Sequence, residues 1–425
     1  MKRKLLLWII CLSPVLVAAQ NTDPKEEVKV EKKFTAKFNG FVKSDFFWDT
    51  RQTVSAREGH FLLYPQPVFE DADGNDINSK SNFNFLSIQS RIGVDFTGPD
   101  VFNAKTSAKI EGDFFAQAND NINLFRLRHA FVKLNWPKTE LLFGQSWIPM
   151  FITGCFPGTV SFNTGTPIQP FGRSPQIRAT YTIEKVKLIG ILSSQRDFAN
   201  VGPAGPTGDY LRNSGIPAID VQMHYQQDNK EAGTAFLFGI GGGYKTIVPR
   251  IKTVQNYSTD DNVSSFSGIA FLKIQLPAIT LKFEGVFGQN IDNVLSIGGY
   301  AVKDSIDLIR GYVNYTPSNT LSFWTDIHTN GKFQAGIFAG FTKNNGFSDD
   351  IVAPSTIFGR GTSIESLFRV SPRMVYSMEH IRFALEGEFT AANYGDGTYD
   401  AKGIPQNTTQ ADNLRLLFSV YYFFK

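Results

Sequence analysis

Apolar and polar residues alternate with a period of two in several long segments of this chain. In 104–114, one face carries Ile110 and Phe114, and the other carries Lys109, Glu111 and Asp113. The same alternation occurs in 86–96, 219–226, 279–287, 381–389 and 414–424. A period of two predicts β-strands. Strands of about ten residues with one charged face are typical of a transmembrane barrel, whereas strands of soluble sandwiches usually have about five or six residues.

The connections between these segments alternate between short and long. Short turns are predicted at 97–101, 136–139, 184–185, 227–232, 277–278, 330–331 and 378–380. Long polar connections are predicted at 49–82, 116–123, 148–174, 196–217, 245–262, 290–306, 343–362 and 392–411. Short turns on one side and long loops on the other are characteristic of outer-membrane barrels.

The strand count follows from parity. A first count gives seventeen strands, but an even number is expected if both chain ends lie on the periplasmic side. Merging 308–329 into one long strand, with a bulge around Thr316-Pro317, gives sixteen. Proline is tolerated at bulges. We therefore predict an all-β fold, a closed antiparallel transmembrane β-barrel of sixteen strands, with eighteen as the alternative.

The composition agrees with such a barrel. The chain has 425 residues with 42% hydrophobic and 19% charged residues, 39 Phe and 37 Gly. That aromatic content excludes a disordered chain, and no apolar run approaches the ~20 residues of a membrane-spanning helix. The net charge of +3 comes from Lys2, Arg3 and Lys4, because the remainder has 42 − 3 = 39 basic and 39 acidic residues. Nothing here indicates a nucleic-acid partner.

The N-terminus has the pattern of a secretory signal peptide over 1–19. Basic residues 2–4 precede the apolar stretch 5–17, and Val17-Ala18-Ala19 offers a cleavage site. An uncleaved anchor helix is the alternative. A charged lead-in at 20–36 and the barrel at 37–425 would follow. After cleavage Cys155 is the single cysteine, so no internal disulfide is possible, and we expect it to be a small buried or loop residue.

Several charged residues are candidates for the lining of a water-filled pore. Arg126 and Arg128 share one strand face, and Arg178 lies on a polar face with Gln176 and Thr180. We interpret them as a basic stripe at the constriction that attracts anions; the alternative is ordinary lumen charge paired with acids. The further candidates are Arg91, Lys109, Glu111, Asp113 and Arg173. Replacing Arg126 and Arg128 with alanine is expected to shift selectivity toward cations and to leave the barrel intact.

Other segments support smaller inferences. The loop 148–174 is long, low in charge and rich in Gly, Pro and Phe, so we expect it to fold into the lumen; the alternative is an external loop. Gly239, Gly241, Gly242 and Gly243 lack a phosphate-binding signature and suit a closely packed strand. The alternation in 125–131 places His129 on the outer face. The acidic turn 71–76 does not match a calcium loop. We expect no catalytic group, metal or cofactor.

Three segments resemble known outer-membrane proteins. Residues 125–147, FRLRHAFVKL…LLFGQSW, are similar to the DcaP-like family of trimeric porins. FAGFTKNNG at 338–346 and SPRMVYSMEHIRF at 371–383 resemble segments of outer-membrane proteins from the Bacteroidota. The resemblance implies a sixteen-stranded homotrimer that passes small, often anionic solutes, with basic constriction positions at Arg126, Arg128 and Arg178. Two features depart from the family: at 20–36 the N-terminal coiled coil is reduced at most to a remnant, and the last residue is Lys425.

The sequence therefore predicts an exported barrel of the outer membrane, in contact with lipid, that allows passive diffusion of small hydrophilic, anionic solutes. The alternative is a plugged barrel with a structural or ligand-binding role. An outer-membrane enzyme lacks a convincing Ser/His/Asp group. An energy-coupled transporter lacks room for a plug domain before residue 38.

Overall fold

The computed structural model describes residues 34–116 and 119–424. The predicted signal peptide at 1–19, most of the lead-in 20–36 and Lys425 lie outside these ranges. The first strand, β1, begins at Thr35, two residues before the predicted start of the barrel. None of the helical segments in the described ranges has the length and apolarity of a membrane-spanning helix.

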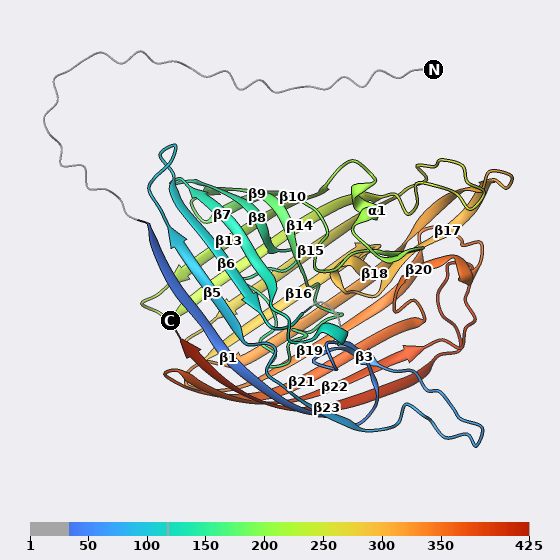
Figure 1. Ribbon diagram of the computed structural model, residues 1–425. Helices are drawn as coiled ribbons and strands as arrows, with labels where there is room; N and C mark the ends of the chain where they lie inside the picture. Colours follow the sequence, from blue (N-terminus) through green and yellow to red (C-terminus); the bar gives the residue numbers. More distant parts are fainter. Residues whose placement is uncertain (1–33, 117–118, 425) are drawn as a thin grey trace, which may run out of the picture. The chain divides into compact units, whose positions relative to one another are not determined.

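The described residues form a closed antiparallel barrel of sixteen wall strands, as the alternation predicts (Figure 1). Strands β4 and β5 both pair with β1 and occupy one position in the wall. The wall strands are β1 (Thr35–Asp49), β4 (Asn82–Leu86) with β5 (Arg91–Thr97), β6 (Lys105–Asp113), β7 (Arg126–Asn135), β8 (Thr139–Trp147), β9 (Arg173–Ile183), β10 (Val186–Ser193), β13 (Ala218–Asn229), β14 (Thr234–Ile247), β15 (Val263–Gln275), β16 (Ile279–Gln289), β18 (Tyr312–Thr329), β19 (Phe333–Phe347), β21 (Ile364–Met378), β22 (Ile381–Tyr394) and β23 (Thr409–Phe424).

The barrel closes where β1 pairs with β23, from Gly40 opposite Phe424 to Asp49 opposite Arg415. Figure 1 shows these two strands, blue and red, side by side. Closure pairs the backbone of every wall strand on both sides, which a barrel in lipid requires.

Alternate residues of each wall strand face outward and inward. In β23, Leu416 and Phe418 are 49% and 40% exposed, whereas Arg415 and Ser419 on the other face are 1% and 0% exposed. The outer wall is therefore apolar, and charged residues point into the lumen. This is the reverse of a soluble protein, and it fits a barrel surrounded by lipid.

The long loops carry short extra elements. They are β2 (Thr53–Ala56), β3 (Phe61–Pro65), η1 (Asn119–Asn121), β11 (Val201–Gly202), β12 (Gly205–Pro206), α1 (Asp209–Arg212), η2 (Asp292–Val294), β17 (Gly298–Asp307), η3 (Pro354–Thr356) and β20 (Ile357–Arg360).

Strand β18 is one long strand, as the even number of wall strands requires. Its first part pairs with β17 and its second part with β16. The bulge predicted around Thr316-Pro317 begins one residue later, because the register shift against β19 lies between Ser318 and Thr320. Pro317 keeps a regular position opposite Tyr300 of β17, and its carbonyl oxygen accepts the N–H of Ser348 at 3.0 Å.

The loop between β8 and β9, residues 148–172, crosses the lumen, as its composition predicts. The Pro149 carbonyl accepts a hydrogen bond from Gln222 of β13 at 2.7 Å, and Gly158 N–H donates to Asp326 of β18 at 3.0 Å. Farther along the loop, the N–H groups of Val160 and Ser161 donate to Glu386 of β22 at 2.6 and 3.0 Å. We call this segment the inner loop.

A second insertion, the β2–β3 hairpin, joins the inner loop in the lumen. Phe61 of β3 meets Phe162 and Phe171 of the inner loop, with ring centroids 5.2 and 5.3 Å apart. The guanidinium of Arg369 on β21 donates to carbonyls of both insertions, Thr166 at 2.6 Å and Leu63 at 2.7 Å. An aromatic core therefore lies inside the barrel and narrows it.

Candidate functional site

A cavity of about 380 Å³ opens beside the inner loop, against strands β5 to β9. We call it the vestibule. Its basic side chains outnumber its acidic ones by five to two. The lining residues are Arg91, Lys109, Glu111, Arg128, His129, Phe131, Lys133, Glu140, Leu142, Ser146, Trp147, Thr153 and Arg178. An excess of positive charge in a narrow, partly desolvated space attracts anions.

Five of the eight candidate residues from the sequence line the vestibule. They are Arg91, Lys109, Glu111, Arg128 and Arg178. Arg126 and Asp113 do not line the vestibule, and Arg173 lines a different cavity. The lumen orientation of β7 and β9 follows from the period of two, which places Arg126, Arg128 and Arg178 on inner faces.

Arg126 and Arg128 form a buried ion-pair network with two carboxylates. Arg126 Nε lies 2.7 Å from Asp113 Oδ1, and Arg128 bridges Glu111 at 2.8 Å and Asp113 at 3.0 Å. The side chains of Arg126 and Arg128 are only 7% and 2% exposed. This geometry agrees with the second interpretation of the two arginines, in which acids pair with them. Most of their positive charge is therefore compensated.

Arg178 and Arg91 are less compensated than the buried pair. Arg178 donates to the side-chain oxygen of Gln176 and to the Trp147 carbonyl, both at 3.0 Å, and no carboxylate pairs with it among the described residues. Arg91 lies 3.5 Å from Glu111, and its Nε has no hydrogen-bond partner in the described part of the chain. These two guanidinium groups are therefore the ones most available to a solute.

The expectation that His129 faces outward is wrong. A register shift between Glu111 and Gly112 inserts one extra residue into β7. Because a bulge turns two successive side chains toward one face, Arg128 and His129 both point inward. The His129 ring lies 5.4 Å from that of Trp147, in the vestibule wall. Alternation alone does not reveal this shift.

Trp147 lines the vestibule and contacts Arg173, which lines the other cavity. Its ring stacks on Phe151 of the inner loop with centroids 4.0 Å apart. The guanidinium groups of Arg128 and Arg173 lie 5.6 and 5.1 Å from the ring centroid, within cation–π range. Arg173 in turn pairs with Asp197 of the loop after β10. The tryptophan is thus held between charged groups of two cavities.

The residues that anchor the inner loop were not among the sequence candidates. Glu386, Glu388, Arg369, Arg373 and Asp326 all face the lumen and bind backbone or side chains of the loop or one another. The alternation in 381–389 already places Glu386 and Glu388 on the polar face. It could not reveal their partners, because those come from a loop more than two hundred residues away.

Cys155 is buried in the inner loop, as expected. Its thiol lies 3.5 Å from the Leu272 carbonyl and 3.7 Å from that of Phe283. Burial raises the pKa of the Cys155 thiol to about 12, so the reactive thiolate is scarce at neutral pH.

We therefore expect Cys155 to resist maleimide labelling in the folded barrel and to react once the protein is denatured in urea. Mass spectrometry of the cleaved chain would measure the labelled fraction. Rapid labelling of the folded protein would contradict the buried position.

Comparisons with known proteins concern the fold. No protein-family profile matches the chain, and no curated protein matches its sequence. The outer-membrane channel DcaP of Acinetobacter baumannii superposes with a TM-score of 0.68 at 14% identity, over 94% of this chain and 99% of that one. The chain shares the fold of that channel.

Two further structures are similar at lower scores. The anion-selective porin from Comamonas acidovorans gives a TM-score of 0.52 at 12% identity, over 92% of this chain and all of that one. A loop-deletion mutant of OmpT, an outer-membrane protein of Vibrio cholerae, gives 0.51 at 11% identity, over 92% and 99% of the two chains. At these identities the similarity is one of architecture.

Proposed function

We propose that this chain is an outer-membrane porin that allows passive diffusion of small hydrophilic, preferentially anionic solutes. The observation that carries the proposal is the vestibule, in which five basic and two acidic side chains line a cavity inside a closed barrel. Diffusion through a pore needs a suitable diameter and field rather than a catalytic group. The similarity of fold to a channel and to an anion-selective porin supports the same function.

The proposed location and assembly follow from the same features. The basic and apolar segments of 1–19 support export, and the apolar outer wall suits the lipid of the outer membrane. We further propose a homotrimer, which the resemblance of 125–147 to DcaP-like porins implies. Size-exclusion chromatography with light scattering in detergent would measure the assembly; a monomer alone would refute the trimer.

The anion preference is tested at Arg91 and Arg178, the two less compensated guanidinium groups of the vestibule. We expect the double variant Arg91→Gln and Arg178→Gln to lower the chloride-to-potassium permeability ratio by roughly thirtyfold, because each of the two charges stabilises a nearby anion by about 1 kcal/mol in water. Reversal potentials of single channels in planar bilayers under a KCl gradient would measure it.

Lys138, exposed in the turn between β7 and β8, provides the matched control. Lys138→Gln removes a positive charge outside the vestibule and should leave the ratio unchanged. An unaltered reversal potential in the double variant would remove the anion-selective role from the vestibule, while open channels would still support a porin.

A second function is favoured by the aromatic core in the lumen. Phe61, Phe162 and Phe171 are 3%, 5% and 2% exposed, and both insertions are anchored to the wall. A lumen sealed by these insertions would make the chain a structural or ligand-binding barrel. Correctly folded protein that never conducts in bilayers would favour this function over the porin.

A further inference from the structure

Two lysine side chains lie opposite each other on the lumen wall, away from the vestibule. Lys273 of β15 and Lys282 of β16 are paired directly in the register of the two strands. Both alternate with residues of the outer wall, such as Phe283, which is 40% exposed. We call them the lysine pair. Directly opposite residues have Cβ atoms about 4.5–5.5 Å apart, and like charges in that position destabilise a sheet.

The inner loop orients one member of the lysine pair. The Lys282 ammonium donates to the Phe156 carbonyl at 2.9 Å and lies 5.4 Å from the centroid of the Phe156 ring. This distance is within cation–π range. Because an ammonium has three N–H donors, two of them remain after the bond to the carbonyl. The side chain is partly exposed, so these donors can meet a solute in the lumen.

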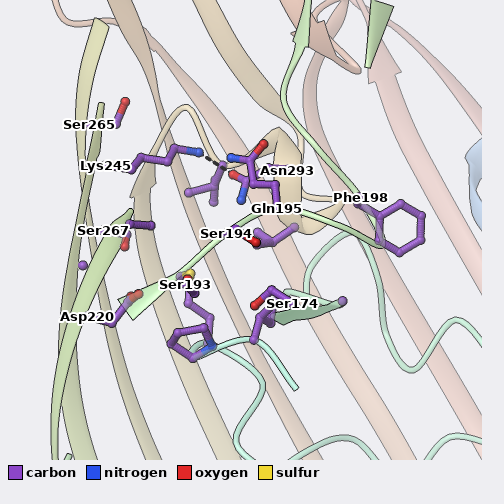
Figure 2. Close-up of a pocket in the computed structure, with 18 of the residues that line it drawn as sticks. Ser174, Ser193, Ser194, Gln195, Phe198, Asp220, Lys245, Ser265, Ser267 and Asn293 are labelled. Atoms are coloured by element: carbon purple, nitrogen blue, oxygen red, sulfur yellow. Dashed lines mark hydrogen bonds between the residues drawn. The ribbon is translucent and has the colours of Figure 1, made fainter. Parts of the chain in front are cut away.

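The other member, Lys273, has no partner in the described part of the chain. Its ammonium forms no hydrogen bond or ion pair with residues 34–116 or 119–424. Lys245, on the neighbouring strand β14, is a contrasting case. Figure 2 shows it pointing toward Asn293 in a separate small cavity. The Lys245 ammonium donates to Asn293, to Asn200 at 3.2 Å and to the Asn290 carbonyl at 2.6 Å, whereas Lys273 keeps its donors available.

The acidic groups beside the lysine pair are bound to other residues. Asp326 of β18 lies opposite Lys282. Its carboxylate is held by the Arg373 guanidinium through two hydrogen bonds, of 2.8 and 3.0 Å. Glu284, two residues after Lys282, is buried and accepts the indole N–H of Trp324 at 3.3 Å. The lysine pair therefore keeps positive charge that its neighbours do not compensate.

We propose that the lysine pair is a binding site for a phosphate group, carried by free phosphate or by a small phosphate ester. A phosphate group has up to two negative charges and three strong acceptor oxygens around one centre. Two ammonium groups on directly opposite positions can therefore bind it together. Lysine is a common phosphate ligand, acting as a point charge. The bound group would also offset the repulsion within the pair.

Other ligand classes fit the lysine pair less well. A flexible dicarboxylate carries its two charges at separate ends, so adjacent ammonium groups would neutralise one end and leave the other. Chloride has a single charge, and an amine would be repelled. The inference goes beyond passive diffusion, because it concerns equilibrium binding at a site outside the vestibule.

Isothermal titration of the purified barrel in a maltoside detergent tests the site. The titration is run at constant KCl and mildly alkaline pH, where phosphate is mainly a dianion. Inorganic phosphate and glycerol phosphate separate the free ion from an ester as the source of the group. Succinate is the matched probe, since it is a dianion with separated charges. We expect saturable heat with at least one of the phosphate compounds, and roughly fivefold weaker binding of succinate.

The variants locate the site. Lys273→Gln and Lys282→Gln should each weaken phosphate binding roughly tenfold, which corresponds to about 1.4 kcal/mol. Lys187→Gln is the matched control. Lys187 faces the lumen from β10, but it lies opposite Thr182 and donates to Gln226 at 2.9 Å. Its replacement removes one lumen charge without affecting the lysine pair, so phosphate affinity should stay at the wild-type value.

Urea unfolding separates ligand binding from a structural role. Without phosphate, Lys273→Gln should unfold at the wild-type urea concentration or above it, because the repulsion between the two lysines is removed. Phosphate should raise the unfolding concentration of the wild-type barrel more than that of the variant, since a ligand stabilises the folded state that binds it. Lys273→Gln still tests the site if Lys282→Gln fails to fold after losing its contact with the inner loop.

The proposal is overturned if the wild-type barrel binds neither phosphate compound, or if Lys273→Gln binds phosphate as tightly as Lys187→Gln does. Succinate binding as tight as phosphate binding would reduce the site to general anion attraction and would also overturn it. The titration does not depend on ion flow. A barrel that never conducts could still bind phosphate, and a conducting barrel that does not bind it would refute this site alone.

Discussion

Replacing Glu386 with alanine should release the inner loop and raise the single-channel conductance. The Glu386 carboxylate is buried and accepts the N–H groups of Val160 and Ser161 at 2.6 and 3.0 Å. A buried donor that loses its acceptor costs about 1–3 kcal/mol, so the attachment loses about 2–6 kcal/mol for two donors. We expect a wider and noisier conducting state, which single-channel recording would measure.

Labelling of Cys155 provides a second measurement of the same release. The thiol lies in the inner loop, so maleimide should react faster in Glu386→Ala than in the wild-type barrel. Glu379→Ala is the matched control, because Glu379 is exposed in the turn before β22. Conductance and labelling rate both equal to wild type would show that Glu386 does not hold the loop in place.

Replacing Arg128 with alanine should destabilise the barrel by about 3 kcal/mol, because breaking a buried ion pair leaves uncompensated charge. Arg128 is the group that joins Glu111 to Asp113. Sequence periodicity alone predicts a change of selectivity without a change of stability. The buried contacts add the stability effect. Urea unfolding in detergent, followed by intrinsic fluorescence, would measure the loss.

A charge-balanced variant separates lost pairing from lost packing. Arg128→Met together with Glu111→Gln removes one charge of each sign and should recover much of the loss, because the buried charge is removed with its partner. Lys138→Ala, in an exposed turn, should have no effect. If Arg128→Ala unfolds at the wild-type urea concentration, the network does not stabilise the barrel.

The strand count and the facing of most lumen residues follow from the sequence. A period of two assigns each side chain to one face, and lipid outside with water inside makes the faces chemically opposite. This is why 414–424 could be assigned to an apolar outer face and an inner face with Arg415, and why Arg126, Arg128 and Arg178 were placed inward. The count of sixteen then followed from the alternation of short turns and long loops, which requires an even number of strands when both chain ends lie on one side.

The sequence did not reveal features that depend on the pairing register of neighbouring strands or on contacts with distant segments. The bulge in β7 that turns His129 inward results from the pairing of β6 with β7, and one inserted residue leaves no compositional trace. The shift in β18 lies between Ser318 and Thr320 for a similar reason, since Pro317 keeps its pairing with β17.

The sequence by itself therefore determined the wall of this protein, because strand periodicity and loop length are local properties. It also indicated that the inner loop, poor in charge and rich in Phe, would enter the lumen. Only the tertiary structure decided which lumen charges are compensated. Arg128 is paired through β6, Glu386 is bound to the inner loop, and Arg178 donates to Gln176 and to the Trp147 carbonyl. Those outcomes depend on side chains brought together from strands far apart in the chain, and alternation along one strand carries no information about them.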